Sequence, residues 1–196
     1  MRGPLARELQ RKSFHMLSLV YLAAYKVLGF PAVLQPMLAW SAVVVAVETW
    51  RLRSRSLNDL LTSFFGGLAR DDERDKFSGI LHTTLGVLVV FLINGRHPAV
   101  VAAAIYCVAF GDAAAALVGK SWGRHPFMAG KSWEGTLACF AGCLMSCRLT
   151  GFSWGCAAAA AFVATTAEAL PTTRWYNDNF WMPVVTGGAL ALCAGF

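Results

Sequence analysis

Carboxylates and cations meet in one stretch of this sequence, from Gly111 to Thr136, where a polar loop separates two apolar runs. Asp112 lies within the first apolar run, and Glu134 opens the second. An ionisable group inside a membrane-length apolar run is costly and usually marks a functional site. Asp112 is therefore a candidate Mg²⁺ ligand or general base, and the alternative is a carboxylate that pairs with a cation for assembly.

Three cations, Lys120, Arg124 and Lys131, lie in the loop between these runs. Glycines let the backbone approach a phosphate, and Lys or Arg side chains neutralise it. The string GKS does not form a P-loop, because His125 or Ala114 stands where the upstream glycine is required. We expect the loop to bind a polyanion at a membrane surface, unless it is an ordinary basic loop. Its candidate phosphate-binding residues are Gly119, Lys120, Gly123, Arg124, Gly130 and Ser132, and Lys131 is a candidate catalytic residue.

Further carboxylates lie near the end of the chain. Glu168 stands near a predicted helix end, and Asp178 and Asn179 precede the last apolar run. Their oxygens suit hard cations such as Mg²⁺, although an Asn here can also cap a helix. Glu134 is a candidate catalytic residue and metal ligand, or a first-turn carboxylate that favours the helix dipole. The predicted metal ligands are Asp112, Glu168, Asp178 and Asn179.

Charged residues and a histidine also precede the first apolar run, in the segment ELQRKSFH. Arg11 and Lys12 are candidate phosphate-binding residues, and His15 is a candidate site residue with a structural role as its alternative. Glu48 and Arg51 close the second apolar run three residues apart, which suits an ion pair on one helix face. That pair can be structural or can serve the site.

The composition indicates a membrane protein. Of 196 residues, 57% are apolar and 14% are charged, and the mean hydropathy is +0.52, whereas a soluble domain carries about 25% charged residues. We expect one all-α domain over residues 1–196, a polytopic bundle of about seven transmembrane helices with its chemistry on the helices and short loops. The net charge of +6 fits membrane topology and anionic ligands. Nucleic acid is not an expected partner, because neither its folds nor its aromatic patterns are present.

The predicted spans are residues 14–30, 34–50, 78–94, 98–118, 135–151, 154–170 and 180–196. The first is interpreted as a retained span and not as a cleaved signal peptide. With the N-terminus in the cytosol, 14 of the 17 Lys and Arg residues lie on the cytosolic side and 3 on the other. This bias predicts that every motif above faces the cytosol. The amphipathic segment Leu57–Ala69 is expected along the membrane interface, as a lipid-guiding element or a simple connector.

The six cysteines favour packing over chemistry. Cys139, Cys143 and Cys147 share one helix face, and thiols behave there as small buried hydrophobic groups. The spacing indicates no disulfide framework, which fits a site that faces the cytosol. The histidines outside the first segment, His125 among them, lack metal-ligand spacing.

Six motifs follow one another along nearly the whole chain: ELQRKSFH at 8–15, ETWR at 48–51, SGILHTTLG at 78–86, FGDAAAALVGKSWG at 110–123, GKSWEGT at 130–136 and EALPTTRWYNDNFWMP at 168–183. In this order they resemble the CTP-dependent lipid kinases, which include the yeast-type diacylglycerol kinase, dolichol kinase and phytol kinase. The resemblance implies transfer of the γ-phosphoryl group of CTP to a membrane lipid alcohol, with Mg²⁺ as cofactor. Asp112 with Asp178 or Glu134 would hold the metal. The triphosphate would lie against Lys131, Arg124 and Lys120.

The acceptor alcohol is less well defined by these motifs. The closing NDNFWMP is similar to the diacylglycerol kinases, which favours diacylglycerol as acceptor, phosphatidic acid as product and, in a eukaryote, the endoplasmic reticulum. Glu134 with its following glycine is closer to the polyprenol, phytol and cytidylyltransferase-like versions, and Asn177 stands where diacylglycerol kinases often have an acid. A dolichol or phytol kinase is the first alternative. The others are a phosphatidate cytidylyltransferase, which releases pyrophosphate, and a small transporter with Asp112 as its ion-coupled site.

Overall fold

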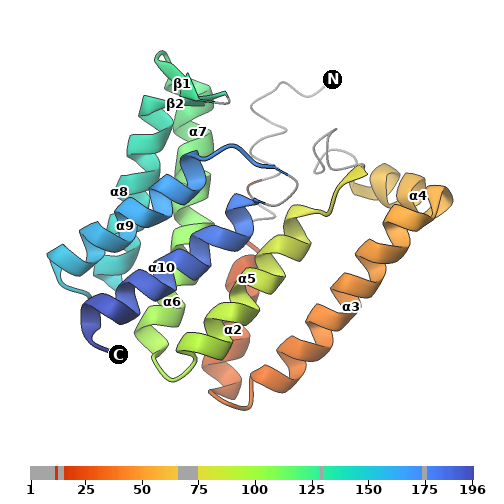
Figure 1. Ribbon diagram of the computed structural model, residues 1–196, viewed down its shortest axis with the longest axis horizontal. Helices are drawn as coiled ribbons and strands as arrows, with labels where there is room; N and C mark the ends of the chain where they lie inside the picture. The colour runs from red at the N-terminus through yellow and green to blue at the C-terminus, as the bar shows by residue number, and fades with distance from the viewer. Residues whose placement is uncertain (1–11, 13–15, 66–74, 129, 174–175) are drawn as a thin grey trace.

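The computed structural model describes residues 12, 16–65, 75–128, 130–173 and 176–196, and it is built almost entirely of helices (Figure 1). The all-α prediction is confirmed, with one short hairpin added. The described helices are α2 (Ser18–Leu28), α3 (Leu34–Arg53), α4 (Arg55–Phe65), α5 (Gly79–Asn94), α6 (Pro98–Tyr106), α7 (Asp112–Trp122), α8 (Trp133–Leu149), α9 (Trp154–Ala169) and α10 (Asp178–Ala194). A π-helical turn, η2 (Cys107–Gly111), joins α6 to α7, and strands β1 (Pro126–Met128) and β2 (Lys131–Ser132) form the hairpin.

The seven predicted spans each correspond to a helix or, for 98–118, to the continuous unit α6–η2–α7. Among the described residues, this unit from Pro98 to Trp122 is the one helix long and apolar enough to cross a membrane by length and composition. The crossing of the membrane by the other helices therefore stays a prediction. The amphipathic segment is helical as α4, up to Phe65, and in Figure 1 it turns away from the axis of α3.

The interior of the bundle is packed with small side chains. Alanines of α9 and the thiols of Cys139, Cys143 and Cys147 on α8 lie in one buried apolar cluster. The outside of α3 instead exposes large apolar groups, Trp40 and Trp50 among them. Extended apolar surface of this kind marks contact with a partner or a membrane. The pattern agrees with helices that pack through small residues and turn large ones toward lipid.

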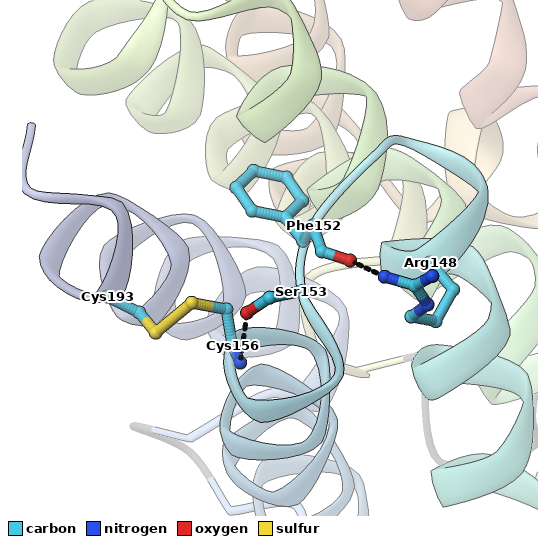
Figure 2. The surroundings of a disulfide bond; sticks show 5 residues. All are labelled: Arg148, Phe152, Ser153, Cys156 and Cys193. Atoms are coloured by element: carbon cyan, nitrogen blue, oxygen red, sulfur yellow. Dashed lines mark hydrogen bonds between the residues drawn. A yellow bond between two sulfur atoms is a disulfide. The ribbon is translucent and has the colours of Figure 1, made fainter.

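The structure corrects the expectation about disulfides. Cys156 at the start of α9 and Cys193 near the end of α10 form a disulfide, with their Cα atoms 5.6 Å apart (Figure 2). Beside it, Arg148 donates a hydrogen bond to the carbonyl of Phe152. Spacing could not reveal this bond, because the two cysteines are 37 residues apart in sequence and meet only when α9 packs on α10.

The bundle has two distinct ends (Figure 1). The hairpin, the C-terminal end of α9 and the N-terminal end of α10 lie at one end, and the C-terminus of the chain lies at the other. The helices alternate in direction, so residues far apart in sequence are brought together at each end. The predicted chemical motifs of the described chain therefore gather at the hairpin end.

Candidate metal and phosphate site

Three carboxylates from three helices converge inside the bundle. Asp112 begins α7, Glu168 lies one residue before the end of α9, and Asp178 begins α10. One oxygen of each lies within 4.8 Å of the others, and the residues are only 6%, 3% and 7% exposed. All three are predicted metal ligands, and the structure brings them together. Metal binding itself stays a prediction.

Local structure determines where two of these carboxylates point. The π-helical turn η2 ends immediately before Asp112, and such turns occur frequently at functional sites. Gly111, the last residue of η2, packs so closely that a Cβ there would lie 3.0 Å from Met182 and nearer still to the thiol of Cys143. At the start of α10, the side chain of Asn177 accepts a hydrogen bond from the backbone N–H of Asn179. That cap fixes the first turn from which Asp178 projects.

Two lysines contact the three carboxylates, which we call the carboxylate trio. Lys12 forms a buried ion pair with Asp112. Lys131 pairs with Glu168, donates to the Glu168 backbone carbonyl at 2.7 Å and lies 3.7 Å from Asp178. Lys12 was predicted at the phosphates, and the structure instead places it against Asp112.

The trio has the character of a divalent-cation site. Its donor atoms are all carboxylate oxygens, which Mg²⁺ prefers. In addition, Glu168 Oε2 is buried without a hydrogen-bond partner in the described structure, although buried polar atoms are normally satisfied. These residues fit Mg²⁺, with Asp112, Glu168 and Asp178 as its ligands.

The loop glycines have a packing role that the sequence does not reveal. Gly119 lies in the last turn of α7 and faces Gly135 of α8. A Cβ added to Gly135 would come within 2.7 Å of the Ala115 carbonyl oxygen. A Cβ on Gly123 would come within 2.6 Å of the Ser132 hydroxyl. These glycines let α7 and α8 approach closely and so bring the hairpin next to the trio.

Of the remaining predicted phosphate-binding residues, two have a structural role in the hairpin and in α8, and two are exposed cations. Ser132 caps α8, because its hydroxyl accepts a hydrogen bond from the backbone N–H of Gly135 at 3.2 Å. Gly130 adopts φ +77° in the hairpin turn, a conformation that favours glycine. Lys120 in the last turn of α7 and Arg124 just after this helix are exposed. Their binding to phosphate stays a prediction.

Glu134 lies outside the trio, contrary to its predicted role as a metal ligand. Its Oε1 is 2.6 Å from Nδ1 of His125, and its side chain is 25% exposed. The hydrogen bond from His125, followed by backbone hydrogen bonds, lowers the pKa of Glu134 from 4.5 to about 2. The pair thus ties the start of α8 to the residue before β1, and His125 has a partner that its spacing did not indicate.

Tyr176 is a neighbour of the site that sequence reasoning missed. Its hydroxyl donates to the carbonyl of Ala167 at 2.7 Å. Burial, and then the negative charges of Asp178 and Glu168, raise the pKa of Tyr176 to about 12. Its position two residues before Asp178 was the available signal. The phenol stays protonated, and its hydrogen bond to Ala167 holds the segment between α9 and α10 against the end of α9.

Glu48 and Arg51 form the predicted ion pair, with Arg51 donating to both Glu48 oxygens at 3.0 and 2.9 Å. Arg51 also donates to the carbonyl of Lys76 at 2.5 Å, and Glu48 accepts from the backbone N–H of Ser78 at 2.8 Å. These contacts join the end of α3 to the start of α5. The predicted ion pair is thus present, and a role of the pair in the site stays a prediction. Two other predicted site residues, Arg11 and His15, lie outside the described residues.

Curated proteins similar to this chain carry the name phytol kinase. Phytol kinase from Synechocystis sp. is 34% identical over 121 residues, which are 57% of this chain and 51% of that protein. "Probable phytol kinase, chloroplastic" from Triticum aestivum is 28% identical over 200 residues, which are 92% and 65% of the two chains. "Probable phytol kinase 2, chloroplastic" from Glycine max is 26% identical over 172 residues, which are 73% and 59%.

The chain therefore spans between about half and two thirds of the length of these curated relatives. No family model matches it, and no solved structure matches it. The likeness to proteins named as lipid-alcohol kinases agrees with the resemblance seen in the motifs. None of the three names mentions diacylglycerol, dolichol or the endoplasmic reticulum.

Proposed function

We propose that this protein is a lipid-alcohol kinase that transfers the γ-phosphoryl group of CTP to the hydroxyl of a long-chain isoprenoid alcohol such as phytol. The observation that carries the proposal is the buried carboxylate trio, with Lys131 in contact with two of its members. The names of the relatives favour phytol over diacylglycerol as the acceptor. The preference for CTP rests on the motif resemblance.

The proposed reaction joins the alcohol oxygen to the γ-phosphorus and breaks the bond between that phosphorus and the β–γ bridging oxygen. CDP leaves with the electron pair of the broken bond. The hydroxyl proton passes to a carboxylate oxygen, most simply on Asp112. Phosphoryl transfer depends mainly on positioning and charge neutralisation, and the buried site offers both.

Each part of the site has a share in this chemistry. Asp112, Glu168 and Asp178 would hold Mg²⁺, which supplies neutralisation of phosphate charge when bound. Lys131 would move from the carboxylates to the phosphate chain as the nucleotide enters, since its side chain is 25% exposed. Lys120 and Arg124 would draw in the triphosphate from solvent. Lys12 pairs with Asp112 and would hold this carboxylate in place.

The lipid would reach this site from the bilayer with its tail between or beside the helices. Large apolar side chains cover the outside of the bundle, which suits lipid on that surface. We further propose that all seven predicted spans cross or enter the membrane, that the hairpin end faces the cytosol, and that α4 lies along the interface.

The test is phosphoryl transfer by the purified full chain in detergent with Mg²⁺ and γ-labelled nucleotide. Phytol, dolichol and diacylglycerol are offered separately, each with CTP or ATP. Label on phytol with release of CDP supports the proposal. Label on diacylglycerol alone would correct the acceptor. Pyrophosphate released with phosphatidate, and no label on any alcohol, would instead make the protein a cytidylyltransferase.

A further inference from the structure

Two threonines of the bundle break a pattern that other helical threonines follow. Within a helix, a threonine hydroxyl commonly donates to the backbone carbonyl four residues earlier. The hydroxyls that do so here, at 2.6–3.2 Å, are those of Thr49, Thr83, Thr84, Thr150, Thr166 and Thr186. The hydroxyls of Thr136 and Thr165 are buried and have no hydrogen-bond partner in the described structure.

The location of these two hydroxyls is informative. Thr165 is 7% exposed and lies three residues before Glu168 on α9, which places both side chains on one helix face about 5–6 Å apart at Cβ. Thr136 lies three residues before Cys139 on α8, and Cys139 belongs to the buried cluster that also contains Ala164 of α9 and Met182 of α10. The buried side-chain atoms without a hydrogen-bond partner in the described part of the chain are Thr136 Oγ1, Thr165 Oγ1 and Glu168 Oε2. Glu168 belongs to the trio, and Thr165 lies about one helical turn from it.

The missing bond of Thr165 contrasts with the bond made by its neighbour in the same helix. Thr166, its neighbour in the same helix, donates to Phe162 at 2.8 Å, so the backbone of α9 supports such bonds at this point. A buried hydroxyl without a partner costs free energy. An unsatisfied group beside a cluster of carboxylates instead suits a polar ligand that completes its hydrogen bonds.

The direction of α9 decides which ligand this is. The helix ends at Ala169 at the hairpin end of the bundle, so Thr165 lies about one turn deeper in the bundle than Glu168. A nucleotide arrives from solvent at the hairpin end, where Lys120 and Arg124 are exposed. A lipid alcohol arrives from the bilayer, on the deeper side of the trio. Its hydroxyl can accept one hydrogen bond and donate another.

We infer that the Thr165 hydroxyl donates a hydrogen bond to the hydroxyl of the acceptor alcohol and positions it against the carboxylate trio. The inference rests on the proposed function. Thr165 is a positioning residue for the acceptor, and the acceptor hydroxyl directs its own proton toward a carboxylate. The nucleotide does not contact it.

The test uses Thr165→Val, which keeps the shape of the side chain and removes the hydroxyl, in the purified full chain. Loss of one hydrogen bond is expected to raise KM for phytol, or to lower kcat/KM for phytol, about tenfold. The KM for CTP and the Mg²⁺ concentration for half-maximal rate stay unchanged. Thr165→Ser keeps the hydroxyl and should have the wild-type KM and kcat/KM for phytol. Thr166→Val, which removes a hydroxyl bonded to the backbone, is the matched control and leaves the phytol KM unchanged.

Two results would overturn the inference. One is a Thr165→Val protein with the wild-type KM for phytol and the wild-type kcat. The other is a change in Mg²⁺ dependence without a change in the phytol KM, which would assign the hydroxyl to water around the metal.

Equilibrium binding of labelled phytol without nucleotide separates this inference from the kinase proposal. If wild-type protein binds phytol and Thr165→Val binds it about tenfold more weakly, the inference stands even when no phosphoryl transfer is seen. If both proteins bind phytol equally, or wild-type protein does not bind it, the inference is wrong.

Discussion

At the scale of single residues, the site combines buried charges of both signs at short range. Lys131 contacts two carboxylates and Lys12 contacts the third. Buried carboxylates need such partners, because an isolated charge in the interior is very costly. The lysines thus hold the trio together. Lys131, the more exposed of the two, is the one that can turn toward a phosphate.

A pH-dependent effect is expected for Glu134 and His125. The hydrogen bond from His125 lowers the pKa of Glu134 to about 2 from 4.5, so the charged form is favoured in the folded protein. This contribution to stability is complete above pH 4.5 and is lost as the pH falls toward about 2. Glu134→Gln should therefore lower Tm at about pH 6, with a difference from wild type that shrinks progressively below pH 4.5.

The measurement is thermal unfolding of both proteins in detergent across this pH range. His125→Ala should reproduce the behaviour of Glu134→Gln, and the double variant should be no worse than either single variant, since the two residues act as a pair. A difference in Tm that stays constant down to about pH 2 would show that Glu134 is not held ionised by His125.

Sequence reasoning found the carboxylates because an ionisable residue next to an apolar run is conspicuous. Asp112, Glu168 and Asp178 could therefore be predicted individually. The partnership of Lys12 with Asp112 could not, since the two residues are 100 positions apart. The sequence also could not predict that the Thr165 hydroxyl lacks a partner, because most helical threonines of this protein donate a hydrogen bond to their own helix backbone.

At the scale of elements, the ends of helices deliver the site residues. The C-terminal end of α9 and the N-terminal ends of α7 and α10 supply the trio, and the hairpin supplies Lys131. The position of Lys131 relative to the trio depends on the close approach of α7 to α8. Gly135 lies at this contact, where an added Cβ would meet backbone atoms of Ala115 at 2.7 Å and Gly119 at 3.1 Å.

Gly135→Ala is expected to push α7 and α8 apart, since backbone atoms cannot rotate out of the way. Overpacking of this kind typically costs about 1–3 kcal/mol. Phosphoryl transfer should fall because Asp112 begins α7, whereas Lys131 lies in β2, which leads directly into α8. Gly188→Ala in α10 is the matched control, because an added Cβ there meets nothing within 4 Å. Alanine is also the better helix former, so the control should be neutral or up to about 1 kcal/mol more stable. Equal activity and Tm in both variants would mean that the α7–α8 contact does not set the site geometry.

The helices were predictable because each apolar run is continuous and is separated from the next by polar residues. The π-helical turn before Asp112 was not, since it depends on packing of Gly111 against Cys143 and Met182. The hairpin was also missed. Its strands have three and two residues, which is too short for an alternating pattern to emerge.

At the scale of the whole molecule, the two ends of the bundle differ in chemistry. The trio and the hairpin lie at one end, and the Cys156–Cys193 disulfide lies toward the other, near the C-terminus. Disulfides persist in oxidising compartments and are rare in the cytosol. If the hairpin end faces the cytosol, as we propose from the charge bias, the disulfide end faces the opposite compartment. The disulfide, which was not expected, thus agrees with the predicted orientation.

Labelling from the two sides of a membrane tests this orientation. In intact bacterial cells, a membrane-impermeant reductant followed by an impermeant maleimide should label Cys156 and Cys193 from outside. A cysteine introduced by Arg124→Cys, at an exposed position near the hairpin, should react only in inside-out vesicles. The double variant Cys156→Ser/Cys193→Ser controls for the four buried thiols. Labelling of both positions from the same side would contradict a bundle with opposite-facing ends.

The most direct measurement of the central claim is transfer of label from γ-labelled CTP to phytol by wild type and by Asp112→Asn, Glu168→Gln and Asp178→Asn, across a Mg²⁺ titration. Wild-type protein is expected to label phytol only in the presence of Mg²⁺. Each variant should lose at least about a hundredfold in rate while remaining folded in detergent, because each removes one charged oxygen ligand from a shared site. Wild-type rates in any of the three variants, or transfer that persists after complete removal of divalent cations, would contradict the account.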